Sequence, residues 1–115
     1  MGGRGVMCPF DIIIAYISWQ GGGKRRPVLV ITKDKDSATV FRITSKYEKK
    51  SEAIRAKYLK INDWSQAGLE KLSYVDTSGK RELPLDTVNN APVGRLSEND
   101  KMRLLVFLMR NGEVL

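Results

Sequence analysis

The chain has 115 residues, with 20 lysines and arginines against 13 aspartates and glutamates, and so a formal net charge of +7. This length predicts one domain with a modest core, and no run of about eighteen apolar residues is present that would predict a transmembrane helix. The charge favours an anionic partner, such as nucleic acid, a membrane surface or an acidic protein, without choosing among them.

Histidine is absent, which excludes Ser-His and Cys-His nucleophile pairs and histidine-ligated zinc. The commonest general base near neutral pH is therefore missing as well. Any catalysis must rely on arginine, lysine, carboxylates, hydroxyls or a bound metal. Cys8 is the only cysteine, so no internal disulfide can form, which fits a reducing cytoplasm. We expect residues 1–8 to form a flexible tail and residues 9–115 to form the single domain.

Two strands joined by a glycine-rich segment are predicted in the first third of the chain. Residues 10–19, "FDIIIAYISW", are nearly continuously apolar and rich in β-branched and aromatic side chains, as in a strand buried on most of both faces. Glycines 21–23 end this strand, and Pro27 opens the next one, "PVLVIT", where proline costs least. These features predict a hairpin with a long loop that carries three cations, Lys24, Arg25 and Arg26.

The next strand is predicted over residues 38–45, and its side chains alternate in character. Phe41 and Ile43 point to one face, whereas Arg42 and Thr44 share the other. Arg42 and Thr44 should therefore lie on the face that does not bury Phe41.

The segments that follow are shorter. Residues 51–63 combine helix-like and strand-like spacings, and we prefer a strand over residues 55–61. Residues 63–71 predict a turn or a short helix. Two short strands are expected at residues 71–77 and 81–88, around a turn centred on Gly79.

A C-terminal helix is predicted for residues 98–110. Ser97, followed three residues later by Asp100, forms an N-cap pattern, and Asn111-Gly112 supplies the stop. Four apolar residues fall at i, i+3, i+4 and i+7 and predict the face that packs on the core: Met102, Leu105, Val106 and Met109. Five or six short strands and one such helix predict a small curled sheet or barrel, mainly β within the α+β class. Homodimerisation is one way to cover the edges of so small a sheet.

Four segments, in this order, resemble the MazF/PemK-type toxins of bacterial type II toxin–antitoxin systems. They are "FDIIIAYISW", "QGGGKRRPVLVIT", "FRITS" and "PVGRLSENDKMRLLVFL", and they span about residues 10–108. The resemblance implies an SH3-like barrel with a C-terminal helix, a homodimer, and a cytoplasmic toxin that cleaves single-stranded RNA at short sequences. Cleavage would proceed by transfer to the neighbouring 2′-hydroxyl, with no metal or other cofactor. An antitoxin with an acidic, extended tail would neutralise the toxin, and no membrane partner is expected.

The resemblance also assigns roles to individual residues. The family's catalytic arginine directly precedes the proline, which is Arg26 here, and its hydroxyl partner falls on Thr44. Arginine presents a planar fork of donors to phosphate oxygens and stabilises charge there, and a threonine hydroxyl can orient the phosphate. Seven further residues are expected to contact the RNA: Trp19, Lys24, Arg25, Arg42, Lys46, Ser73 and Asp76. Two of these belong, with Tyr74, to the segment "SYVDT", where family members contact RNA or their dimer partner.

The sequence does not identify the residues that would transfer protons during cleavage. The pKa of arginine lies above about 12, so arginine is a poor general base. The segment "QGGGKR" has no carboxylate where some family members carry one, which leaves Glu48 and Asp76 as the alternatives. The missing carboxylate also supports a second hypothesis, a non-catalytic module of the same fold that binds nucleic acid or an acidic peptide. A third hypothesis, action on DNA gyrase, is disfavoured because the related gyrase-directed toxins lack the basic Arg-Pro segment.

Overall fold

The structure is a computed structural model that describes residues 7–88 and 91–112. Six strands form one antiparallel sheet in the order β4-β5-β3-β2-β1-β6. The strands are β1 Asp11–Trp19, β2 Gly22–Lys33, β3 Ser37–Thr44, β4 Tyr58–Lys60, β5 Tyr74–Pro84 and β6 Gly94–Arg95. The helices are α1 Glu52–Arg55, the 3₁₀ turn η1 Leu85–Thr87, and α2 Glu98–Arg110. Among the described residues, no helix is long and apolar enough to cross a membrane.

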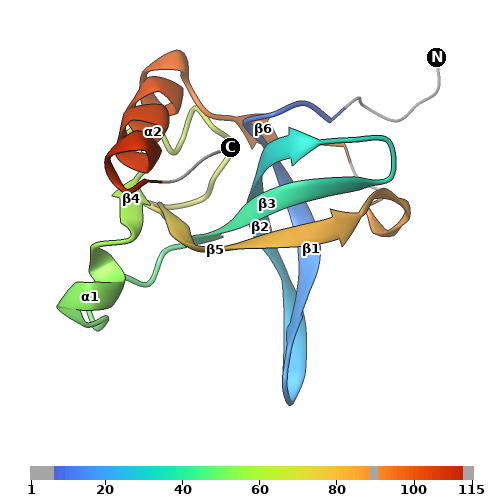
Figure 1. The fold of residues 1–115 in the computed structure, drawn as a ribbon, viewed down its shortest axis with the longest axis horizontal. Helices are drawn as coiled ribbons and strands as arrows, with labels where there is room; N and C mark the ends of the chain where they lie inside the picture. The colour runs from blue at the N-terminus through green and yellow to red at the C-terminus, as the bar shows by residue number, and fades with distance from the viewer. Residues whose placement is uncertain (1–6, 89–90, 113–115) are drawn as a thin grey trace.

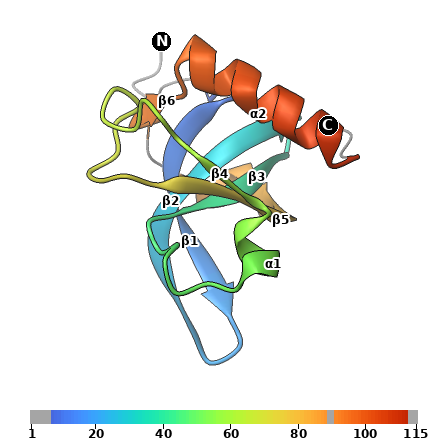
Figure 2. The same ribbon diagram turned by 90° about the vertical axis from the view of Figure 1, so that its left-hand side faces the viewer.

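The sheet is curled, and α2 lies along one side of it. Figure 1 and Figure 2 both show α2 at the end of the molecule opposite the tip of the β1–β2 hairpin. This arrangement confirms the predicted fold class, a mainly β, curled sheet with one C-terminal helix.

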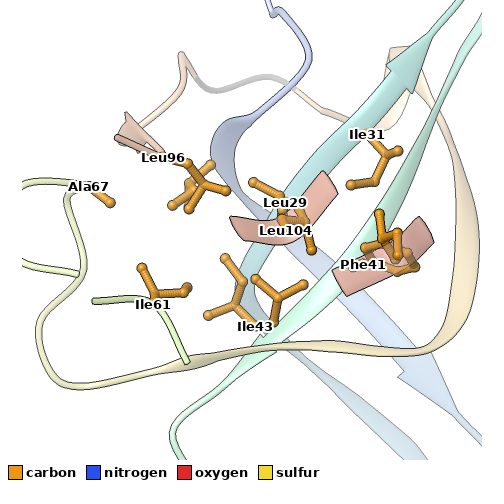
Figure 3. Close-up of a cluster of buried hydrophobic side chains, with 11 residues drawn as sticks. Leu29, Ile31, Phe41, Ile43, Ile61, Ala67, Leu96 and Leu104 are labelled. Atoms are coloured by element: carbon orange, nitrogen blue, oxygen red, sulfur yellow. The ribbon is translucent and has the colours of Figure 1, made fainter. Parts of the chain in front are cut away.

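An apolar cluster covers each face of the sheet. The larger cluster includes Phe41 and Ile43 of β3 together with Leu104 of α2, as Figure 3 shows. The other contains Val28 and Val40 and packs against Leu85 of η1, among others. Phe41 and Ile43 are buried, whereas Arg42 and Thr44 are only half-buried, so the predicted alternation along β3 is confirmed. β3 therefore contributes apolar side chains to both clusters and presents Arg42 and Thr44 on the face that carries Val40.

The β1–β2 hairpin has a tight turn, so the predicted long basic loop is wrong. Trp19 pairs with Gly22, which leaves only Gln20 and Gly21 between the strands, and Gly21 adopts a φ of +90° that favours glycine. The three cations at positions 24–26 therefore lie within β2. Gly22 and Gly23 do not lie in a loop, because they pair with Trp19 and Ser18 at the end of a ladder of eight pairs between β1 and β2.

β5 is one continuous strand, so the two strands predicted around a turn at Gly79 are wrong. Both halves of β5 pair with β3, and a register irregularity separates the pair Val40↔Arg81 from the pair Arg42↔Asp76. Gly79 lies in this irregular stretch, where no neighbouring atom would come within 4 Å of an added Cβ. A glycine inside a strand often marks such a bulge rather than a turn.

The segment between β3 and β5 contains both kinds of structure that its spacings suggested. Ser51 caps α1 by accepting a hydrogen bond from the backbone N–H of Ile54 at 3.3 Å. β4 follows at Tyr58–Lys60, within the range predicted as a strand. Residues 62–68 form successive turns without a regular helix.

The bounds of the C-terminal helix are as predicted, but its buried face is not. The Ser97 hydroxyl accepts a hydrogen bond from the backbone N–H of Asp100 at 3.1 Å, which confirms the N-cap. Leu104 and Leu108 face the core, whereas three members of the predicted stripe are exposed, Met102 by 56%, Val106 by 44% and Met109 by 75%.

The face of α2 that packs on the core is determined by a polar contact, which the spacing of apolar residues does not predict. Buried Asp100 accepts hydrogen bonds from the backbone N–H groups of Asn62 at 3.2 Å and Asp63 at 2.8 Å. Its carboxylate also forms an ion pair with Arg103 at 2.8 Å. Because these contacts point Asp100 inward, Leu104 and Leu108 follow on the same face one and two turns later.

Met7 and Cys8, which were predicted to belong to a flexible tail, contact the rest of the domain. Met7 packs against the second apolar cluster, and the backbone N–H of Cys8 donates to the Asp11 carboxylate at 2.8 Å. These two residues therefore belong to the folded domain, while residues 1–6 lie outside the described part of the chain.

We predict that Asp100→Ala lowers the free energy of unfolding by about 2 to 4 kcal/mol, because it leaves two buried N–H groups without an acceptor. Urea denaturation followed by circular dichroism measures this change. The control is Glu98→Ala, which removes an exposed carboxylate from the same first turn and should cost less than about 1 kcal/mol. Equal losses in the two variants would show that Asp100 does not anchor α2.

Candidate functional site

A row of polar side chains crosses three strands on the face of β3 that carries Arg42. Arg42 of β3 pairs with Asp76 of β5, and Asp76 pairs with Tyr58 of β4. Directly paired residues of an antiparallel ladder share one face, with Cβ atoms about 4.5–5.5 Å apart. The next row on this face consists of Thr44, Tyr74 and Lys60. The two rows define the candidate site.

Arg26 lies on the same face of the sheet, on the neighbouring strand β2. Val28 pairs with Arg42, and Arg26 follows the same side of β2 two residues earlier. Continuing that register by two residues brings Arg26 opposite Thr44. The Nε of Arg26 is buried, yet it has no hydrogen-bond partner among the described residues. A buried N–H without an acceptor lowers the stability of the fold by about 1 to 3 kcal/mol. This guanidinium is therefore suited to donate a hydrogen bond to an anionic ligand.

The Asp76 carboxylate interacts with Arg42 and Ser78. Its carboxylate is 2% exposed and forms an ion pair with Arg42 at 2.6 Å. The hydroxyl and the backbone N–H of Ser78 donate to it at 2.6 and 2.9 Å. Burial by itself would raise the pKa of Asp76, but the hydrogen bonds from Ser78 and the contact with Arg42 outweigh it and hold this pKa below its ordinary value. Asp76 is therefore an anion at neutral pH and holds Arg42 in place.

Within residues 7–88 and 91–112, no group of three or more histidine, cysteine, aspartate or glutamate side chains is placed to hold a metal ion.

Of the comparisons with known proteins, only the one with solved structures found a match, and it shows the fold alone. No protein-family model and no curated protein matches the sequence. Among solved structures, the chain is similar to the toxin MazF-mt6 of Mycobacterium tuberculosis, with a TM-score of 0.68. The two are 20% identical, and the match covers 91% of this chain and 99% of that one. The chain has the fold of a MazF-type toxin. The resemblance drawn from the four sequence segments is thereby confirmed at the level of the fold.

Within this MazF-type fold, four of the remaining predicted site residues lie in three different places. Trp19 and Lys24 lie on the same face of the hairpin as Arg26, farther along the part that projects beyond the sheet (Figure 1). Arg25 lies on the opposite face, beside Tyr16, because successive strand residues alternate. Lys46 is exposed just beyond β3, and its backbone N–H donates to the Thr44 hydroxyl at 3.1 Å.

Ser73 has a structural role in the described chain. It is 5% exposed, and its hydroxyl donates to the backbone carbonyl of Lys71 at 2.9 Å. Its own carbonyl accepts a hydrogen bond from the backbone N–H of Ile61. Ser73 is therefore not brought together with Arg26 and Thr44.

A tyrosine cluster beside Thr44 was not predicted from the sequence. The rings of Tyr47 and Tyr74 are stacked, with centroids 4.3 Å apart, and Tyr58 is tilted against both. The Arg55 guanidinium lies over the Tyr47 ring, 5.3 Å from its centroid. No sequence spacing relates these residues, because the cluster depends on the pairing of β4 with β5 and on the path of the loop after β3.

We predict that Asp76→Asn changes the dependence of stability on pH. Because the folded-state pKa of Asp76 lies below the ordinary value of 3.8, its ionised form stabilises the fold above about pH 4. This stabilisation is lost as the pH falls further, so the variant should be less stable at pH 7 and should lose less stability in acid. Thermal unfolding from pH 7 downward measures both effects. Asp86→Asn, at an exposed carboxylate of η1, is the control. Parallel stability curves for wild type and Asp76→Asn would contradict the prediction.

Proposed function

We propose that the protein is the toxin of a toxin–antitoxin pair and acts in the cytoplasm as a metal-independent endoribonuclease on single-stranded RNA. The observation that carries this proposal is Arg26, whose buried Nε has no acceptor in the described part of the chain and which shares a face with Arg42 and Thr44. Two guanidinium groups and a hydroxyl on one face suit a phosphodiester. The fold-level likeness to MazF-mt6, a toxin, supports the same reading.

The proposed reaction is an internal transfer. The 2′-oxygen of the RNA attacks the adjacent phosphorus, the bond from phosphorus to the 5′-oxygen breaks, and a 2′,3′-cyclic phosphate remains. Arg26 stabilises the charge that grows on the non-bridging oxygens, and Arg42, held by Asp76, assists from the neighbouring strand. The Thr44 hydroxyl orients the phosphate.

Glu48 and Asp76, the two carboxylates that the sequence offers for proton transfer, differ in their surroundings. Asp76 is buried, ion-paired and has a lowered pKa, which suits it to hold Arg42 and makes it a weak acceptor of protons. Glu48 is exposed on the loop after β3, close enough to Tyr74 that its charge acts on that phenol. We therefore assign acceptance of the 2′-hydroxyl proton to Glu48 or to water.

We predict that the wild-type protein cuts single-stranded RNA in EDTA and that Arg26→Ala slows cutting at least about 100-fold, because it removes the donor to the developing charge. The products should carry 2′,3′-cyclic phosphate and 5′-hydroxyl ends, and an oligonucleotide with 2′-deoxyribose at the cut site should stay intact. Gel analysis of labelled RNA with mapping of the ends measures these outcomes.

Arg25→Ala is the matched control, because it removes the neighbouring cation from the opposite face of β2. Its activity should stay within about tenfold of wild type. RNA that is bound but never cut would favour the non-catalytic module instead, and growth arrest with intact RNA and blocked gyrase would favour the third hypothesis.

The exposed apolar face of α2 is the surface that we assign to a second copy of the chain. Met102 and Val106 line a groove together with Leu59 of β4, the strand at one edge of the sheet. An isologous contact would cover the apolar groove and the short edge strand together. The antitoxin, with its acidic tail, would instead bind the cationic face around Arg26 by charge complementarity.

We predict that the wild type is a dimer and that Val106→Arg shifts it toward the monomer, because a charge would be buried in the contact. Ile54→Arg on α1 is the control, since Ile54 and Val106 are each 44% exposed. Size-exclusion chromatography with light scattering measures the masses. A monomeric wild type, or a dimer that Val106→Arg leaves intact, would contradict this assignment.

A further inference from the structure

The proposed cleavage needs a group that gives a proton to the departing 5′-oxygen. Histidine, the usual donor, is absent from the sequence. An arginine guanidinium holds its proton too tightly for this role, and Asp76 is ionised. Among the groups that the two polar rows bring together, the hydroxyls and Lys60 remain.

Tyr58 is a nearly buried tyrosine whose hydroxyl has no hydrogen-bond partner among the described residues. The residue is 9% exposed, and no described group forms a hydrogen bond with its hydroxyl. In the described part of the chain, the one buried side-chain polar atom without a partner is Arg26 Nε. The Tyr58 oxygen also lacks a partner within residues 7–88 and 91–112 but is not among these buried atoms, so it reaches the surface. Buried tyrosines normally satisfy their hydroxyls within the protein, so an unpaired one at a surface is free to meet a ligand.

The Tyr58 hydroxyl is close to the charges of the candidate site. Tyr58 pairs with Asp76, which in turn holds Arg42. Burial raises the pKa of Tyr58, and the charge of Asp76 raises it further, while Arg42 and Arg26 act in the opposite direction. The phenol is therefore protonated at neutral pH, and all three site charges act on it from nearby.

The orientation of the Tyr58 ring is set by its aromatic neighbours. Its centroid lies 6.2 Å from that of Tyr47 and 6.3 Å from that of Tyr74, with interplanar angles of 45° and 38°. Tilted pairs at such distances are favourable, so the ring is held from two sides. A donor fixed in this way is placed before the substrate arrives.

We propose that Tyr58 is a catalytic residue that donates its phenolic proton to the 5′-oxygen as the bond from that oxygen to phosphorus breaks. This proposal rests on the RNA cleavage proposed above. The bond between the 2′-oxygen and phosphorus forms, and the electron pair of the breaking bond passes to the 5′-oxygen, which takes the proton from Tyr58. The phenolate then regains a proton from water, while the 2′-hydroxyl proton leaves to Glu48 or water.

The chemistry of the leaving group favours a phenol in this role. An alkoxide is more basic than a phenolate, so the proton moves downhill once the bond to phosphorus lengthens. The Arg26 and Arg42 guanidinium groups, whose charges oppose the rise in the pKa of Tyr58, stabilise the phenolate that forms. Arg26 and Arg42 would therefore stabilise negative charge both on the phosphate and on the Tyr58 phenolate.

The test compares Tyr58→Phe with wild type on two RNA substrates of one sequence. One substrate has the natural 5′-oxygen at the cut site, and the other has a 5′-sulfur, which leaves as a thiolate without needing a proton. We expect Tyr58→Phe to slow cutting of the oxygen substrate by about 10²- to 10⁴-fold and of the sulfur substrate by less than about fivefold. Affinity for a 2′-O-methyl RNA of that sequence, which cannot be cut, should stay unchanged.

Tyr16→Phe is the matched control, because it removes a tyrosine hydroxyl from the opposite face of the β1–β2 hairpin, beside Arg25, and keeps the ring. It should cut both substrates within about fivefold of wild type. Equal activity of Tyr58→Phe and wild type on the oxygen substrate would overturn the proposal. An equal loss on both substrates would also overturn it, because it would show a role in positioning. If the wild type cuts neither substrate, the proposed function itself fails and the role of Tyr58 with it.

Discussion

The register of β3 is the constraint on which the rest of the structure depends. This strand lies between β2 and β5, and it buries Phe41 and Ile43 in the cluster beneath α2. Burying two such side chains contributes about 3 to 6 kcal/mol, whereas a slip by one residue would turn Arg42 into that cluster. The hydrophobic face therefore determines where the polar face presents Arg42 and Thr44, and no separate interaction is needed to aim them.

The irregularity in β5 completes the site. If the register of Val40↔Arg81 continued unchanged, Arg42 would lie opposite Gly79. The extra residues of β5 instead bring Asp76 opposite Arg42, and Ser78 within the irregular stretch binds the Asp76 carboxylate. β-bulges commonly re-aim side chains in this way next to functional sites. The stretch around Gly79, which was predicted to be a turn, therefore brings the buried carboxylate of Asp76 opposite Arg42.

Local signals in the sequence predicted the features that depend on local physics. The alternation along β3 and the cap at Ser97 were correct because each follows from a few adjacent residues. The extent of the hairpin, the continuity of β5 and the inward face of α2 were missed because each depends on a distant partner, as with Asp100 and the loop at Asn62. Arg26 and Thr44 could be named from a family motif, whereas Tyr58 enters the site only through the pairing of β4 with β5.

A chain without histidine can still place positive charge and a proton donor around a phosphate. In the candidate site one anion, Asp76, acts on a residue of each kind. Asp76 holds Arg42 by an ion pair, and its charge adds to burial in raising the pKa of Tyr58, whose phenol is protonated at neutral pH. A phosphate with growing negative charge would bind Arg26 and Arg42, while the leaving oxygen would take the proton of Tyr58. The cost of this arrangement is the unpaired Arg26 Nε, which the ligand would satisfy. Binding of the proposed substrate would supply the acceptor that Arg26 Nε lacks among the described residues, and so would stabilise the folded protein.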